Sequence, residues 1–267
     1  MQISPPFGYK QVVPFQKTHK VRLLAPGEVP EFVREGAAIP ISHNEFVPAG
    51  RHYPIVFISG DGKNFNAVAV VGMNTKENLF VSDGRWAGGS YMPAYARRYP
   101  FCMARMNVNQ VEQKNRLICV EQSAIDVQGE AMFDDKGQPT SKWQDFERLL
   151  GEYETDLERM RQMCAILSDY GLLEPFTMKA TLKPEKGGGS MLLGGMHRVA
   201  EKNIENLNAA QLKNLMRKGI LARLYIHLLS LHNFGGLLDR KAARQAGALH
   251  RGLRHGVGPA PRPRSRQ

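Results

Sequence analysis

The sequence predicts an α+β fold, with a β-rich N-terminal half, a helical C-terminal half and a basic tail. Short runs of β-branched and aromatic residues, separated by turns, gather in the first half of the chain. Apolar residues spaced three and four apart dominate the second half. Strands that precede helices, without an alternating βαβ pattern, are typical of the α+β class.

The strands are expected from Pro54 onward, after about 50 proline-rich residues that we expect to lie as extended chain over the core. Gly- and Asp-containing segments separate the apolar runs and predict turns between them. The expected strands cover residues 54–59, 66–73, 78–83, 100–105 and 116–121.

One long amphipathic helix is expected over residues 143–167, where apolar side chains form a single stripe. Ser141, followed by Gln144 three residues later, fits a capping box at its start. Gly171 fits its end, and Gly151 marks a point at which the helix could divide in two.

Two further strands and two further helices are expected beyond this helix. The strands would cover residues 176–182 and 190–199, and the helices residues 206–219 and 220–234. Asn208 fits the N-cap of the first of these helices.

The positive charge is concentrated at the C-terminal end of the chain. The net charge is +11, and the segment Arg240–Gln267 contributes eight Lys or Arg residues and no acidic residue. We therefore expect a single domain over residues 1–238, followed by a basic Pro/Arg-rich tail over 239–267 that is disordered at its end.

Cysteine usage and hydropathy exclude several classes of protein. Cys102, Cys119 and Cys164 are odd in number and widely spaced, which indicates reduced, buried thiols rather than a disulfide framework. The sequence has no apolar run of 18 residues, and its start has no signal-peptide pattern. We expect a cytoplasmic protein, or one exported to the cell surface by a route that reads no N-terminal signal.

An aromatic and arginine-rich block over residues 86–101 is the first candidate binding site. Aromatic rings stack on ligands, and the planar guanidinium of arginine binds anionic groups through paired hydrogen bonds. The same residues could instead fill a corner of the core, and the sequence leaves both interpretations open. The candidate ligand-binding residues are Trp86, Tyr91, Tyr95, Arg97, Arg98 and Tyr99.

A His-x-Glu pattern is the alternative candidate, as part of a metal site. His43 and Glu45 have the spacing of one imidazole and one carboxylate ligand, and His52 or His197 could supply a third ligand. Two histidines and one carboxylate would suit non-haem iron. The other interpretation is a loop histidine beside an unrelated glutamate.

Several segments together resemble the SapC family, over about residues 10–238. The core of the resemblance is W-x-G-G-x-Y-x-P-A-Y-x-R-R-Y-P-F at residues 86–101, while the basic tail lies outside it. The resemblance implies an association with bacterial surface-layer loci, and it carries over no catalytic residue. The other matching segments are HNEFVP (43–48), YPIVF (53–57), MFDDKGQPT (132–140), GGMHRVAEKNIENLN (194–208) and KGILARLYIHLLSLHNFGGL (218–237).

Three hypotheses about function follow. The first is a soluble accessory or binding protein of a surface-layer or nutrient-uptake locus, without a cofactor, whose ligand is a glycan, a peptide or an anionic group. Its partners would be surface-layer or uptake components. The second is an enzyme that depends on iron or another divalent metal, held by His43 and Glu45. The third is weak, non-specific contact with nucleic acid or other anions through Arg240–Gln267.

Overall fold

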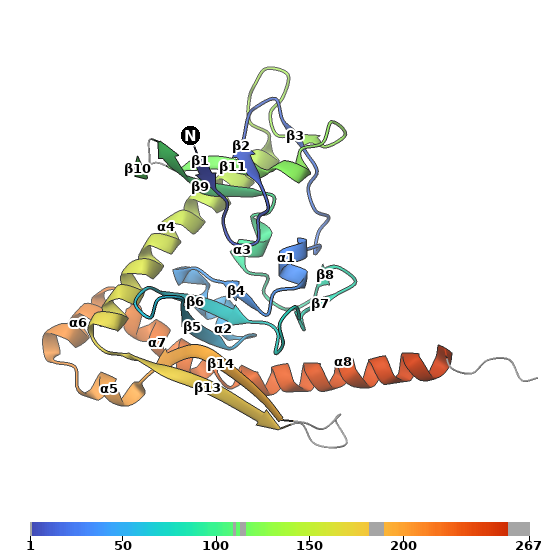
Figure 1. Cartoon of the computed structure of the whole chain (residues 1–267). Coiled ribbons are helices and arrows are strands. Elements are labelled where there is room, and N and C mark those ends of the chain that lie inside the picture. The colour runs from blue at the N-terminus through green and yellow to red at the C-terminus, as the bar shows by residue number, and fades with distance from the viewer. Residues whose placement is uncertain (1, 109–110, 113–115, 182–189, 256–267) are drawn as a thin grey trace, which may run out of the picture.

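Two antiparallel sheets lie toward opposite ends of one long helix, α4 (Ser141–Asp169), in the computed structural model of the protein (Figure 1). The structure describes residues 2–108, 111–112, 116–181 and 190–255. The sheets concentrate in the N-terminal half and the helices in the C-terminal half, so the α+β prediction is confirmed.

The first sheet, called sheet I, has the strand order β1-β9-β11-β2, and β10 pairs with the outer part of β9. Its strands are β1 (Gln2–Ser4), β2 (Val12–Pro14), β9 (Phe101–Val108), β10 (Val111–Glu112) and β11 (Leu117–Glu121). One face of this sheet packs on Trp143 and Leu150 of α4, together with Val21 and Met132 from neighbouring loops and strands. This buried cluster is called core I.

The second sheet, called sheet II, has the order β13-β14-β5-β6-β4 and joins distant parts of the chain. Its strands are β4 (Ala38–Pro40), β5 (Ile55–Ser59), β6 (Phe65–Val70), β13 (Leu173–Thr181) and β14 (Ser190–Val199). The larger apolar cluster around it, called core II, includes the C-terminal half of α4. The strands expected over 54–59, 66–73, 176–182 and 190–199 are thus present within a few residues.

Two short ladders complete the β structure. They are formed by β3 (Lys20–Val21) with β12 (Glu130–Ala131), and by β7 (Val81–Ser82) with β8 (Arg85–Trp86). The strand expected over residues 78–83 is therefore only two residues long. Asn78 explains the difference. Its Nδ2 donates a hydrogen bond to Val33 O and its Oδ1 accepts one from Phe80 N, which holds the backbone of residues 78–80 in a turn.

The N-cap of helix α4 lies one residue earlier than the sequence indicated. The side chain of Thr140, not that of Ser141, accepts a hydrogen bond from Trp143 N and caps the helix. Gly151 does not interrupt it, since both halves bury side chains against a core. Gly171 adopts φ +62° directly after the helix, a conformation that favours glycine.

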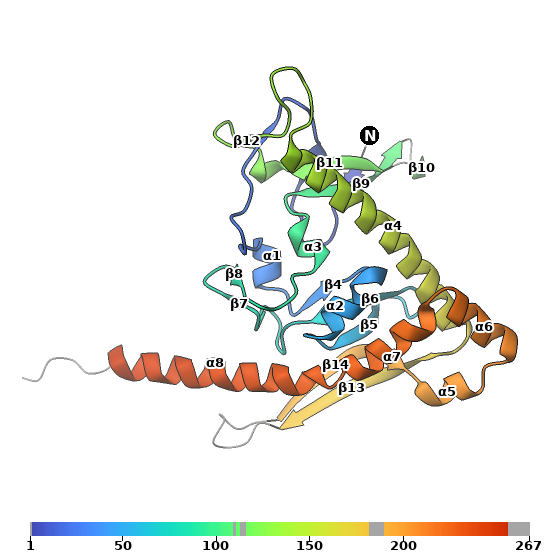
Figure 2. The ribbon, with the colours of Figure 1, turned by 180° about the vertical axis from the view of Figure 1, so that it is seen from behind.

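The remaining helices are short, except for α8 (Asn233–His255), which runs past the body of the molecule (Figure 2). Asn208 caps α6, as expected, and it also forms a capping box with Gln211. The other helical segments are α1 (Glu31–Arg34), η1 (His43–Glu45), α2 (Phe46–Gly50), α3 (Ala94–Arg97), η2 (Gln122–Ala124), α5 (Glu201–Glu205), α6 (Ala209–Arg217) and α7 (Ile220–Ser230).

The first part of the expected basic tail belongs to α8 and packs on the body. Lys241 pairs with Glu77, and Arg244 donates hydrogen bonds to Asn78 O and Val81 O at 3.0 and 2.7 Å. The end of the tail, residues 256–267, lies outside the described residues.

Two further expectations concern the whole chain. Cys102, Cys119 and Cys164 are free and buried, which confirms their interpretation as reduced, buried thiols. Across the part of the chain that the structure describes, no helix has the length and apolar character needed to cross a membrane.

Candidate functional site

Arg97 and Arg98 point to different sides of the segment that carries them. Pro93 precedes α3, Arg97 is its last residue and Arg98 follows in helical geometry. Successive side chains on a helix are about 100° apart, so adjacent arginines face different surroundings. Arg97 is exposed and donates hydrogen bonds to Met92 O and the Tyr91 hydroxyl, whereas Arg98 is only 2% exposed.

The Arg98 guanidinium is enclosed by three tyrosine rings. Its central carbon lies 4.1 Å from the ring centre of Tyr95, 4.9 Å from that of Tyr153 and 5.6 Å from that of Tyr9. Such contacts are cation–π interactions, which strengthen when water is excluded. Burial raises the pKa of Tyr95 to about 12 and that of Tyr153 well above its ordinary value, so both phenols are neutral at pH 7.

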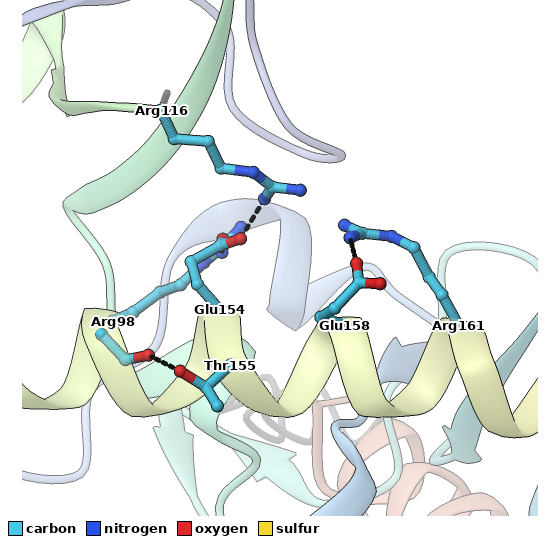
Figure 3. A network of polar contacts seen from close by, with 7 residues as sticks. Arg98, Arg116, Glu154, Thr155, Glu158 and Arg161 are labelled. Carbon is cyan, nitrogen blue, oxygen red and sulfur yellow. Dashed lines mark hydrogen bonds and ion pairs between the residues drawn. The ribbon is translucent and has the colours of Figure 1, made fainter. Parts of the chain in front are cut away.

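The carboxylate of Glu154, on α4, interacts with two arginines, Arg98 and Arg116 (Figure 3). Glu154 forms a close ion pair with Arg116, while its other oxygen lies 4.0 Å from Arg98 Nη1. Burial raises the pKa of Glu154, and the two arginines offset this only in part. The cluster of Arg98, Arg116 and Glu154 carries one more positive than negative charge, because arginine stays protonated at neutral pH.

Two buried donors in this cluster have no partner. Arg98 Nε and the Tyr153 hydroxyl make no hydrogen bond, although each side chain is 2% exposed. Buried polar groups are normally satisfied, and an unsatisfied one costs about 1–3 kcal/mol. An unpaired guanidinium nitrogen beside an unpaired phenol therefore indicates a place where an acceptor could bind.

Arg98, Tyr153, Glu154 and Arg116 line a cleft of about 860 Å³ between sheet II, the strands of sheet I and α4. We call it the central cleft. Apart from the charged cluster, most of its wall is apolar, and Phe7, Ile58 and Leu192 are exposed at its edge. The apolar wall includes Pro40, Val68, Met103, Leu157 and Leu193.

A second, polar pocket of about 560 Å³ lies beside the adjacent face of α4. Tyr91, Arg97, Asp156 and Arg159 line it, and Tyr153 lines both this pocket and the central cleft. Asp156 accepts hydrogen bonds from Asn44 Nδ2 at 2.9 Å and Arg159 Nη1 at 3.1 Å. Within this pocket, Asp156 and Arg159 therefore form an ion pair, while Arg97 is held by Met92 O and the Tyr91 hydroxyl.

Glu45 is buried at the edge of the polar pocket and links two segments of the chain. One oxygen accepts hydrogen bonds from Ala94 N at 2.6 Å and the Tyr91 hydroxyl at 3.0 Å. The other accepts from Ser42 N at 2.7 Å and closes the capping box of η1. Both oxygens are occupied, so Glu45 fixes the Tyr91–Ala94 segment on η1.

The His-x-Glu pattern forms a 3₁₀ turn, with His43 Nδ1 buried and unpaired. Burial lowers the pKa of His43, and the nearby Arg223 acts in the same direction. Of the suggested third ligands, His197 packs on Phe65 in sheet II and His52 contacts Tyr53. Within the described residues, no three His, Cys, Asp or Glu side chains gather in a group that could hold a metal ion.

The six residues predicted to bind a ligand do not share one site. Tyr95 and Arg98 line the central cleft, whereas Tyr91 and Arg97 line the polar pocket. Trp86 stacks on Phe80 within core II.

Tyr99 lies apart from both sites. It lines a smaller pocket of about 390 Å³ with Lys10 and Glu121, and its ring packs against that of Tyr9.

Sequence reasoning did not select Tyr153, Glu154 and Arg116 for the site. Tyr153 belongs to the apolar stripe that identified α4, which gives it the pattern of an ordinary core residue. Arg116 is the first residue of a predicted strand and has no unusual neighbours in the sequence. The sequence feature that could have indicated the site is Glu154, a charged residue directly after a tyrosine of the apolar stripe.

One comparison with known proteins identifies the family of the chain. A family model described as SapC matches residues 16–237, so the chain belongs to the SapC family. The matched segment contains Arg98, Arg116 and Glu154 and stops before the greater part of α8. No curated protein and no solved structure matches the chain.

Proposed function

We propose that this SapC-family chain is a binding protein whose ligand occupies the central cleft. The observation that carries the proposal is Arg98, a buried guanidinium at the cleft wall with an unpaired Nε. A buried charge is costly unless it is closely paired, and Glu154, at 4.0 Å, is shared with Arg116. A ligand with an acceptor group would complete this pairing.

The size and lining of the cleft support the same proposal. Small-molecule sites are typically concave, about 300–1,000 Å³ in volume, and mostly apolar with a few polar groups that orient the ligand. The central cleft, at about 860 Å³, has these features. We also propose an accessory role alongside surface-layer or uptake components, and this part of the proposal rests on the family resemblance alone. The proposed binding function requires no cofactor.

The metal-dependent alternative has less support from the geometry. Both oxygens of Glu45 accept hydrogen bonds from the protein, and a metal would have to displace at least one of them. We therefore propose no metal-dependent reaction.

A thermal-shift screen with a cleft-filling variant tests the proposed function. The library should contain monocarboxylates, amino acids, short peptides and oligosaccharides. Asn66 is an exposed residue of β6 at the cleft wall, so Asn66→Trp would fill the cleft without disturbing a core. We expect at least one class of compound to raise the Tm of the unmodified protein and to lose this effect in Asn66→Trp.

Val127→Trp is the matched control, because Val127 is 82% exposed in a loop that does not line the cleft. It should retain the ligand response of the unmodified protein. An equal response in Asn66→Trp, or no response to any compound, would contradict binding in the central cleft.

A further inference from the structure

We infer that the ligand of the central cleft is a monocarboxylate with an apolar chain. Its carboxylate would lie between Arg98, Tyr153 and Arg116, and its chain would lie along the apolar wall. This inference rests on the proposed binding function and specifies the chemical class of the ligand.

The charge of the cluster argues for an anion with a single negative charge. Arg98 and Arg116 supply two positive charges and Glu154 one negative charge, at a site where all three side chains are largely buried. One added negative charge would balance the cluster. A dianion such as a phosphate monoester would add a second negative charge beside Glu154, where like charges repel strongly in a low-dielectric environment.

The unpaired donors argue for a carboxylate in particular. Arg98 Nε and the Tyr153 hydroxyl are buried and both lack a partner, and they belong to neighbouring side chains, since the Tyr153 ring centre is 4.9 Å from the guanidinium carbon. A carboxylate has two oxygens with several lone pairs, so one group can accept from both donors. Such hydrogen bonds to a charged acceptor are roughly twice as strong as those between neutral groups.

The rest of the cleft argues for an apolar chain rather than a sugar. Val68, Leu157 and Leu193 form part of its wall, and Phe7 and Leu192 are 63% and 69% exposed at its edge. A hydrocarbon chain on this wall would gain about 25 cal/mol for each Å² removed from water. Sugar hydroxyls placed along this apolar part of the wall would lose hydrogen bonds to water that Val68, Leu157 and Leu193 cannot replace.

Titration calorimetry of the whole 267-residue chain with four simple probes tests the inference. Decanoate carries both the carboxylate and the chain. Decanol has the same chain with a neutral head group, decylammonium has it with a positive head group, and acetate has the carboxylate without the chain. All are used below the concentrations at which they form micelles. We expect decanoate to bind at least about tenfold more tightly than each of the others, since only decanoate satisfies both parts of the site.

Two substitutions in the charged cluster should change the affinity for decanoate in opposite directions. Arg116→Met removes a positive charge and leaves Glu154 to pair with Arg98, so binding should weaken by about tenfold or more. Glu154→Gln removes the competing carboxylate, so binding should become several-fold tighter. If the cluster had only a structural role, the two substitutions would not change the affinity for decanoate in opposite directions.

Glu158 and Arg161 provide the matched controls. They form an exposed ion pair at 2.8 Å about one turn further along α4 (Figure 3), and neither lines the central cleft. Glu158→Gln and Arg161→Met should leave the affinity for decanoate unchanged. Circular dichroism of each variant establishes that it is folded before its affinity is compared.

The outcomes separate this inference from the proposed function. Equal affinity for decanol and decanoate, or unchanged affinity in Arg116→Met, would overturn the carboxylate assignment. If no probe binds, while another compound binds and is excluded by Asn66→Trp, the ligand class is wrong and the proposed function stands. If no compound of any class binds in the cleft, both fail.

Discussion

His227 links α7 to two strands of sheet II through a buried neutral imidazole. Val199 N donates a hydrogen bond to His227 Nε2 at 3.0 Å, so the proton is on Nδ1, which donates to Ile55 O at 2.9 Å. Burial lowers the pKa of His227 to about 4 from its ordinary value of 6.5. A protonated ring would lose the bond from Val199 N, so stability should depend on pH.

Between about pH 6.5 and pH 4, the unfolded chain binds a proton at His227 that the folded protein does not bind. The free energy of unfolding should therefore fall as the pH falls, by about 1.4 kcal/mol per pH unit from this residue and on the order of 3 kcal/mol in total. Urea denaturation at pH 7 and pH 4.5 measures the loss. His227→Gln should be less stable at pH 7 and lose less stability on acidification than the unmodified protein.

The exposed His232 supplies the control for this experiment. His232→Gln should keep the pH dependence of the unmodified protein. The same pH dependence in His227→Gln would show that carboxylates, and not His227, cause the loss.

Glu45 supports a second prediction at the residue scale. Its carboxylate accepts hydrogen bonds from Ser42 N, Ala94 N and the Tyr91 hydroxyl. Glu45→Gln places an NH₂ donor opposite donors, so it should lower the free energy of unfolding by about 2 kcal/mol. Glu152→Gln, an exposed change in the same pocket, should cost less than about 0.5 kcal/mol in the same denaturation experiment. Equal effects would mean that Glu45 does not hold the two segments together.

At the element scale, glycines at two positions should respond in opposite ways to alanine. Gly219 adopts φ +67° between α6 and α7, where an alanine is strained and its Cβ would lie 3.1 Å from Arg223 Nη1. Gly219→Ala should cost about 1–2 kcal/mol. Gly151 lies within α4 with open space around it, so Gly151→Ala should stabilise the protein by about 0.5–1 kcal/mol. Thermal unfolding should show a lower Tm for the first variant and a higher Tm for the second.

Local patterns predicted the elements well, because each pattern depends on nearby residues. The stripe of α4, the glycine Gly171 after it and the N-cap at Asn208 are all properties of a few successive residues. The cleft is different, since its charged cluster joins Arg98, Arg116 and Glu154 from three separate segments. No pattern in a single sequence shows that these residues meet, and adjacent Arg97 and Arg98 give no sign of which one is buried.

At the scale of the whole molecule, α4 belongs to both cores. Trp143 and Leu150 pack in core I, whereas Tyr153, Met163 and Leu167 pack in core II. Because α4 is continuous, unfolding of one core would disrupt the part of the helix that packs in the other core. The central cleft lies where α4 passes between the two sheets. The two cores should therefore unfold together, as expected of a single domain.

The two tryptophans allow this cooperativity to be measured core by core. Trp86 lies in core II and Trp143 in core I, and the chain has no other tryptophan. In Trp86→Phe, fluorescence reports core I alone, and in Trp143→Phe it reports core II alone. Within each variant, the urea midpoint from fluorescence should coincide with that from far-UV circular dichroism, because a two-state transition is the same for every probe. A separate early transition of Trp143 would mean that core I unfolds independently, and that the cleft lies between two units and not within one.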